Sequence, residues 1–302
     1  MGPMILPTHD RFDYVPLPQR RDYSWPGRKR LALYIAVNIE TFGYGMELGP
    51  VLGGALPKPD HRNWSWREYG TRVGVWRLFD LFDELGLPAT HLVNSCLYDT
   101  HAAIFEPIRR RGDELIGHGR TNSERPGALD EDGERALIAE ATAAIARHEG
   151  RPPGGWMPPL MSESAVTLDL LKEAGYRFVL DWPCDDQPYW MRTRAGPLLC
   201  VPYPLETNDL VPILQLQHDP LQFVETVVRQ FEEMVEQSER APLVFAISLH
   251  TMVFGQPHRL RALRDGLRGI MAHRLFDRVW LTRPGAIAAH CESLPKGTVP
   301  GS

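Results

Sequence analysis

Continuous apolar runs and helical periodicities alternate along most of the chain. Residues 31–37, LALYIAV, form an apolar run typical of a buried strand. Residues 72–85 instead repeat apolar side chains at the spacing of one helix face, and Gly86 suits the end of that helix. Asp130 and Ser162 are placed to cap two later helices. The pattern predicts further strands over 89–94, 114–117, 177–180, 243–249 and 278–281, and helices over 102–111, 130–148, 163–174, 220–239 and 259–273.

This alternation of strands and helices predicts an α/β fold. Strand-then-helix units imply parallel strands joined by right-handed crossovers. Seven or so units favour a closed or nearly closed (β/α) barrel in a single domain over residues 30–293. Residues 1–29 carry prolines and arginines without lasting periodicity, so we expect an N-terminal arm laid over the domain, and residues 294–302 look like a frayed tail. Functional side chains of such barrels follow the strands, at their carboxyl ends.

Composition excludes several classes of protein. Hydrophobic residues make up 43% and charged residues 24% of the chain, as in ordinary globular domains. The net charge of −5 gives no electrostatic reason to expect nucleic acid or a membrane as a partner. No apolar segment approaches the ~20 residues that cross a bilayer, and no signal-peptide pattern opens the chain. The four cysteines form no CxxC pair, so we expect neither a disulfide nor a zinc framework, and a soluble cytoplasmic protein.

Polar residues follow four of the predicted strands. Glu40 comes after the first strand, His118 after the strand 114–117, Asp181 to Asp186 after the strand 177–180, and His250 after the strand 243–249. A single polar residue at a strand end is often structural. Because the carboxyl ends of parallel strands meet at one edge, four such positions together predict a functional site, with Glu40, His118 and His250 as its catalytic residues.

Five other residues are candidates for contact with a substrate, and most of them have an ordinary structural alternative. Trp156, in the loop GGWMPP, either faces a substrate or packs in the core. Asp185 and Asp186 either bind the polar edges of a small ring or form a turn. Trp190 is a candidate wall of the same pocket. Arg120 either lies at the pocket mouth, where it would favour a carboxylate-bearing substrate, or forms a surface ion pair.

Several segments resemble the polysaccharide deacetylase (NodB-homology) family, and in particular its branch of metal-independent allantoinases. The resemblance rests on WSWREYGTRVGVWRLFDLF at 64–82, ELIGHGRTN at 114–122, DDQPYW at 185–190, VPYPLETND at 201–209 and SLH at 248–250. It runs from about residue 30 to about residue 290. It implies an irregular (β/α) barrel with fewer than eight strands, in agreement with the pattern above.

The resemblance also implies which residues carry the chemistry. In metal-dependent members, an aspartate pair supplies a general base and a metal ligand, and a His-x-x-x-His motif supplies two further ligands. Glu40 stands at the base position and Thr41 at the ligand position, while His118 is followed by Asn122 in place of the second histidine. Zinc needs about three protein ligands, and a neutral hydroxyl or amide oxygen is a poor donor. We therefore expect no cofactor, with zinc or another divalent cation as the less favoured alternative. The last motif's histidine, usually a general acid, falls at His250.

These observations predict a hydrolase of carbon–nitrogen bonds other than peptide bonds. The favoured substrate is a small cyclic amide, imide or ureide, which is easier to open without a metal than an acetamide. Glu40 is the expected general base, with a pKa raised by apolar and aromatic neighbours, and His118 and His250 are expected to donate to the oxyanion or the leaving nitrogen. Two alternatives stay open: a metal-dependent N-deacetylase of a carbohydrate or similar amide, and an inactive descendant that binds a small molecule. We also expect a homo-oligomer, as in the allantoinase-like relatives.

Overall fold

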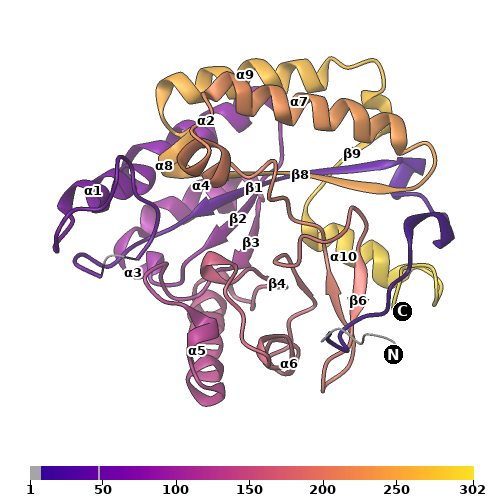
Figure 1. Cartoon of the computed structure of the whole chain (residues 1–302), viewed down its shortest axis with the longest axis horizontal. Coiled ribbons are helices and arrows are strands. Elements are labelled where there is room, and N and C mark those ends of the chain that lie inside the picture. Colours follow the sequence, from indigo (N-terminus) through magenta and orange to yellow (C-terminus); the bar gives the residue numbers. More distant parts are fainter. Residues whose placement is uncertain (1–7, 47) are drawn as a thin grey trace, which may run out of the picture.

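The strands form one curled sheet in the computed structural model, which describes residues 8–46 and 48–302 (Figure 1). They are β1 (Leu31–Ile39), β2 (Thr90–Val93), β3 (Glu114–Gly117), β4 (Gly155–Trp156), β5 (Phe178–Val179), β6 (Tyr189–Met191), β7 (Leu198–Cys200), β8 (Leu243–His250) and β9 (Val279–Leu281). Their order is β6-β7-β5-β4-β3-β2-β1-β8, and β9 pairs with the start of β1. Only β6 runs antiparallel to its neighbour, β7. The predicted irregular (β/α) barrel is confirmed.

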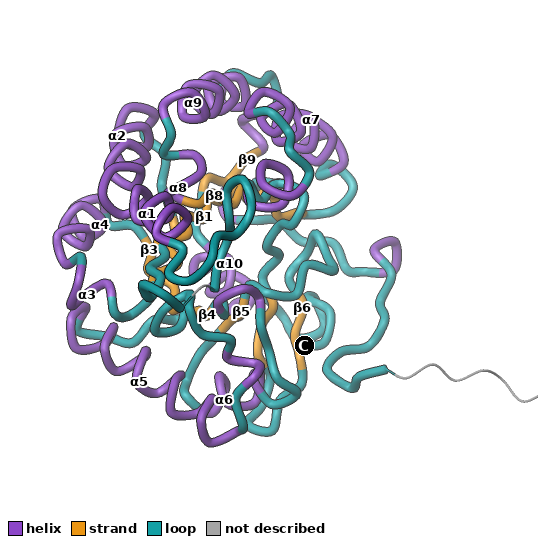
Figure 2. Tube along the Cα trace, turned by 60° about the vertical axis from the view of Figure 1, so that its left-hand side comes forward, coloured by secondary structure: helices purple, strands orange, loops and turns teal. Residues whose placement is uncertain are grey.

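Helices wrap the outside of this sheet (Figure 2). They are α1 (His61–Tyr69), α2 (Val75–Leu85), α3 (Leu97–Thr100), α4 (Phe105–Arg111), α5 (Glu131–Glu149), α6 (Thr167–Glu173), α7 (Pro220–Gln237), α8 (Thr251–Phe254), α9 (Pro257–Met271) and α10 (Pro284–Ser293). A π-helical turn, Gly70–Gly74, joins α1 to α2, and another follows β7 at Val211–Gln215. No helix of the described residues is long and apolar enough to cross a membrane.

One predicted helix boundary is wrong. The helix expected from residue 163 begins at Thr167, and Ser162 does not cap it. Leu160 and Met161 adopt positive φ angles of 60° and 52°, which turn the chain away from a helical path. The Ser162 hydroxyl instead accepts a hydrogen bond from the backbone N–H of Gly127. The segment before α6 is therefore an irregular loop.

The two faces of β1 have different neighbours. Its odd-numbered side chains, from Leu31 to Ile39, pack outward with apolar residues of α2, α7 and α9. Its even-numbered side chains Ala32, Tyr34 and Ala36 face the barrel interior. Since side chains alternate along a strand, the same interior face continues to Glu40 just beyond the strand.

The free edge of β8 is closed by segments outside the regular strands. The Val244 N–H donates to the Asp186 carbonyl at 2.9 Å, and the Ser248 N–H donates to the Thr207 carbonyl at 3.0 Å. The Asp209 N–H then donates to the Ser248 carbonyl at 3.1 Å. These bonds place the proline-rich segment after β7 beside the end of β8.

The described part of the N-terminal arm, residues 8–29, is fixed to the domain by side chains, while residues 1–7 lie outside the described residues. Both terminal nitrogens of Arg11 reach the Asp169 carboxylate at 2.9 Å. Trp25 is buried, and its indole N–H donates to the Leu243 carbonyl at 3.0 Å. The arm therefore contributes to the core at the start of β8.

The C-terminal segment also packs against the sheet. The sequence pattern predicts a frayed tail over residues 294–302, yet Val299 is buried and the Trp190 N–H donates to the Pro300 carbonyl at 2.8 Å. A short segment without periodicity gives no sign of such a docking site in its own sequence.

Candidate active site

Three predicted catalytic residues meet at the carboxyl ends of β1, β3 and β8. Glu40 Oε1 lies 3.4 Å from His118 Nε2 and 3.5 Å from His250 Nε2. The three residues are only 6%, 2% and 3% exposed. The ends of these three strands therefore bring Glu40, His118 and His250 into one buried cluster, although their catalytic roles stay predictions.

A second carboxylate, Asp209, holds His250 from its other side. Asp209 Oδ1 accepts the Nδ1–H of His250 at 2.6 Å, and Oδ2 accepts the backbone N–H of His250 at 2.8 Å. Asp209 is completely buried. Sequence reasoning missed its role, although it is the last residue of VPYPLETND, one of the segments that carry the family resemblance.

The charges of this group follow from mutual contact. Burial acts to raise the pKa of Glu40, but the charge of His250 and hydrogen bonds from both histidines outweigh it and lower that pKa to about 2. Burial acts to lower the pKa of His250, but Glu40 and Asp209 outweigh it and raise that pKa to about 10. Burial raises the pKa of Asp209 above its ordinary value. At neutral pH Glu40 is an anion and His250 an imidazolium.

The expectation of a raised pKa for Glu40 is therefore wrong. It assumed apolar and aromatic neighbours, whereas the neighbours of this carboxylate are two imidazole rings. Glu40 Oε2 is buried and has no hydrogen-bond partner among the described residues. This oxygen is available to a water molecule or a substrate.

The ring of His118 is oriented by a backbone carbonyl. Its Nδ1 lies 2.6 Å from the Met157 carbonyl oxygen. Because a carbonyl oxygen only accepts, Nδ1 carries a hydrogen. Nε2, on the other side of the ring, faces Glu40 Oε1 at 3.4 Å.

Asn94, which follows β2, connects the strand ends around the centre. Its Oδ1 accepts the backbone N–H of Thr41 at 2.9 Å, and its Nδ2 donates to the His118 carbonyl. Nδ2 also donates to Asn122 Oδ1 at 2.8 Å, while the Asn122 N–H donates to the Thr41 carbonyl at 2.9 Å. An N–H only donates and a carbonyl only accepts, so these partners fix the Asn94 amide and, through it, the Asn122 amide.

Trp156 lies away from this centre. It is completely buried in an apolar cluster outside the barrel, where its ring packs at 5.4 Å between centroids from that of Tyr176. The next residue, Met157, packs with the interior cluster instead, as alternation along a strand requires. The packing alternative for Trp156 is the one that the structure supports.

Arg120 is also outside the centre. It pairs with Glu124 at 2.7 Å and with Glu140 on α5 at 2.5 Å, on the protein surface. This is the surface ion pair that the sequence left open. The arginine is not free at the mouth of the site.

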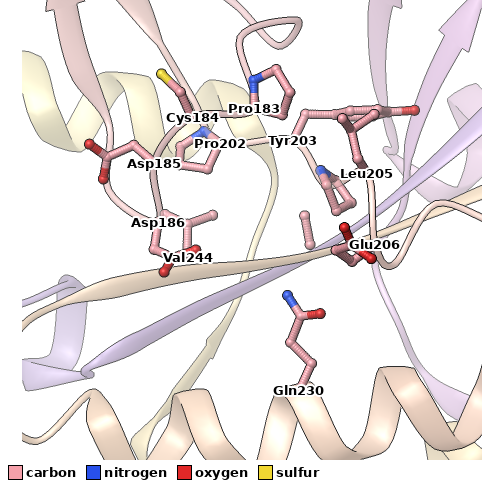
Figure 3. A pocket seen from close by; sticks show the side chains of 12 residues that line it. Pro183, Cys184, Asp185, Asp186, Pro202, Tyr203, Leu205, Glu206, Gln230 and Val244 are labelled. Carbon is pink, nitrogen blue, oxygen red and sulfur yellow. The ribbon is translucent and has the colours of Figure 1, made fainter.

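Asp185 and Asp186 line a separate cavity of about 350 Å³, between the loop that carries them and the segment after β7 (Figure 3). Asp185 forms a two-pronged ion pair with Arg20 of the arm, both N···O distances being 2.6 Å. Gln230 of α7 lies across the cavity, and neither Glu40 nor the two histidines are among its lining residues.

Trp190 lines another cavity, of about 590 Å³, which lies between β6 and the C-terminal residues. None of the catalytic triplet Glu40, His118 and His250 is among its lining residues. The predicted substrate contacts are thus distributed over the molecule, whereas the predicted catalytic residues lie together.

The comparisons with known proteins agree with this fold. Residues 68–179 match the sequence model of a family described as polysaccharide deacetylase. The crystal structure of PuuE allantoinase is similar, with a TM-score of 0.78 and 28% identity, over 89% of this chain and 92% of that chain. A Schizosaccharomyces pombe protein described as a polysaccharide deacetylase is 27% identical over 295 residues, 87% of this chain and 91% of its own length. The peptidoglycan deacetylase of Helicobacter pylori is 27% identical over 172 residues, 55% of this chain and 57% of its own length.

The chain is similar to the polysaccharide deacetylase family over residues 68–179, and to PuuE allantoinase over most of its length. This confirms the resemblance read from the sequence. The protein is an amidohydrolase, which cleaves carbon–nitrogen bonds.

The positions that the family resemblance assigns to metal ligands carry altered residues in this chain. These positions are Thr41, His118 and Asn122, and only His118 is a strong donor to zinc. The Asn122 oxygen is already bonded to Asn94. Among the described residues, no group of three or more histidine, cysteine, aspartate or glutamate side chains is placed to hold a metal ion. The residues present do not fit the family's metal site.

Proposed function

We propose that this protein hydrolyses a small cyclic amide, imide or ureide, of the allantoin type, without a metal. The observation that carries the proposal is Glu40 Oε2, a buried carboxylate oxygen without a partner among the described residues, on a side chain that also contacts His250. An ionised acceptor and a protonated donor next to each other are the general base and general acid of an amide hydrolysis. The likeness to PuuE allantoinase and the altered metal positions support the same reading.

In the first step, water attacks the substrate carbonyl. Glu40 Oε2 accepts one hydrogen of the water and so orients its oxygen toward the carbonyl carbon. The carbon–oxygen bond forms, one water proton passes to Glu40, and the carbonyl π pair moves onto oxygen as an oxyanion.

In the second step, the ring opens. The oxyanion pair re-forms the carbonyl, the carbon–nitrogen bond breaks, and the imidazolium of His250 gives its Nε2 proton to the leaving nitrogen. Protonated Glu40 and neutral His250 then lie in contact, and the proton returns to His250 because its pKa of about 10 exceeds that of Glu40, about 2. One water is consumed and the resting ion pair is restored.

The burial of the centre favours a small substrate. The three central side chains are at most 6% exposed, so a ring of a few atoms fits this setting better than a polymer strand. A strained ring with a good nitrogen leaving group is also easier to hydrolyse without a metal than an acetamide is.

The test is the isosteric variant Glu40→Gln, assayed on allantoin, hydantoin and succinimide. We expect kcat to fall by ~10²–10⁴, the usual contribution of a positioned base, with an unchanged fold by circular dichroism. Glu225→Gln, at an exposed ion pair on α7, is the matched control and should keep full activity. Full activity of Glu40→Gln would rule out the proposed base.

A metal-dependent N-deacetylase is the second candidate. The family match and both deacetylase relatives support it as well as they support a ring-opening hydrolase. Elemental analysis of the purified protein, together with acetate release from N-acetylglucosamine oligomers, separates the two. Near-stoichiometric zinc with acetate release would favour the deacetylase, and tight ligand binding without turnover would favour an inactive binding protein.

A homo-oligomer and a cytoplasmic location stay predictions. Light scattering coupled to size exclusion tests the first, and cell fractionation tests the second.

A further inference from the structure

We propose that Asn122 is a catalytic residue, whose side-chain N–H groups donate hydrogen bonds to the oxyanion formed during hydrolysis. This inference rests on the proposed function, because it assigns the group that stabilises the intermediate of that reaction. Asn122 stands where metal-dependent members carry a ligand, and its amide supplies a neutral donor there.

The orientation of the Asn122 amide leaves its donors unused. Its Oδ1 faces Nδ2 of Asn94 at 2.8 Å, in an arrangement fixed by the Thr41 N–H and the His118 carbonyl. The Nδ2 group of Asn122 is therefore turned away from Asn94, and it donates to no described residue. The residue is only 1% exposed. A side-chain donor without a protein acceptor is available to a partner that arrives with the substrate.

The contacts of Asn122 connect it to the segments that carry the reacting groups. Its backbone N–H is bonded to the carbonyl of Thr41, the residue after the proposed base Glu40. It lies in the loop that begins with His118, whose carbonyl binds the same Asn94 amide. Asn122 is thus held beside the end of β1 and, through Asn94, beside the end of β3.

The other polar groups of the centre already have different tasks. The proton of His250 is needed by the leaving nitrogen, and Glu40 Oε2 accepts a proton. His118 Nε2 contacts the Glu40 carboxylate at 3.4 Å, so it is already engaged with the base. We therefore assign the oxyanion donor to Asn122 rather than to His118.

The expected effect follows from known oxyanion donors. Removing one such donor lowers kcat by ~10²–10³, since the bond strengthens as the charge develops. We therefore expect Asn122→Ala and Asn122→Asp to lower kcat on allantoin or hydantoin by ~10²–10³, with KM changed less than about threefold. Two variants are used because the aspartate adds a charge near Glu40, whereas the alanine adds none.

Gln187→Glu is the matched control for changing a buried amide. Gln187 is 1% exposed, and its amide donates to the Pro242 carbonyl at 2.7 Å, away from the centre. It should keep kcat, although its stability will fall. A loss of kcat under threefold in Asn122→Ala would overturn the inference and leave the proposed function standing.

A measurement without turnover separates the two proposals. Methylphosphonate, a tetrahedral anion that resembles the intermediate, is titrated into ¹⁵N-labelled protein while the Asn122 side-chain amide is followed by NMR. If the wild type opens none of the rings, the proposed function fails and this titration decides the inference. A saturable shift of the Asn122 amide supports the donor, and an unmoved amide overturns it.

Discussion

Replacing Asp209 with asparagine should lower the pKa of His250. Asp209 accepts two hydrogen bonds from His250, at 2.6 Å from the ring and at 2.8 Å from the backbone. An asparagine side chain has one oxygen and one NH₂ group, so it keeps only one of these bonds. The variant also removes one of the two carboxylates that face the imidazolium.

The size of the shift follows from that loss. An opposite charge within ~4–6 Å shifts a pKa by about 1–3 units. Without it, His250 should titrate about 1–3 units below the present value of about 10, while Glu40 continues to hold it above an isolated imidazole. The raised pKa of His250 also makes the stability of the fold depend on pH. In the wild type, His250 contributes stability that is complete below pH ~6.5 and is lost as the pH rises through about 10.

Two assays measure this shift. The Cε1–H resonance of His250 reports its titration by NMR between pH 5 and 11, without any substrate. The pH dependence of kcat/KM reports the same group during turnover. The wild-type profile should be flat through the neutral range, since Glu40 stays ionised down to about pH 2 and His250 stays protonated up to about pH 10. In Asp209→Asn, the alkaline limb should move to pH ~7–9.

The result that refutes this reasoning is equally definite. A wild-type His250 that titrates near pH 6.5, or an alkaline limb that Asp209→Asn leaves in place, would show that the carboxylates do not hold the proton. Asp265→Asn is the matched control, because that aspartate pairs with Arg261 on the exposed side of α9. It should move neither measurement.

Three further substitutions test residues outside the centre. Glu163 and Asp181 are buried carboxyl groups, and burial is the main cause that raises their pKa values to about 10 and about 6. Glu163→Gln removes a group that the fold keeps from ionising, so the Tm should rise at pH 8 and rise less at pH 5. Each kcal/mol of added stability should raise the Tm by ~2–4 °C. Calorimetry at both pH values measures it, and a lower Tm at pH 8 would contradict it. Trp156→Phe should cost ~1–2 kcal/mol in urea unfolding and leave KM unchanged, because the ring packs outside the barrel. Arg120→Ala should cost less than ~1 kcal/mol, and a tenfold rise in KM would restore the arginine as a substrate contact.

The strands and helices that could be predicted are those that the local pattern of apolar and polar residues specifies. β1 and β3 begin where the apolar runs begin, and β3 matches the predicted range 114–117. A parallel strand in a barrel has to be apolar through its length and to end at the shared edge. Glu40, His118 and His250 could be found for that reason, since each is the first polar residue after such a strand or ends it.

The parts that could not be predicted depend on contacts between distant loops. Asp185 follows a strand in the sequence as closely as many catalytic residues do, but its loop turns toward the arm. Trp190 lies in β6, whose backbone is bonded to the C-terminal segment. Asp209 lies in a proline-rich segment without periodicity, and its role exists only because that segment pairs with the free edge of β8. No spacing in the sequence expresses either arrangement.

The charge state of Glu40 illustrates the same limit at the level of chemistry. A carboxylate at the end of an apolar strand would be a weak acid if its surroundings continued the strand's composition. Its proton affinity is instead set by His118 and His250, which the barrel brings to within 3.4 and 3.5 Å. The consequence is a different kind of base from the one expected. A carboxylate with so low a pKa holds a proton only briefly, so catalysis by Glu40 requires His250 beside it to take that proton back in every cycle.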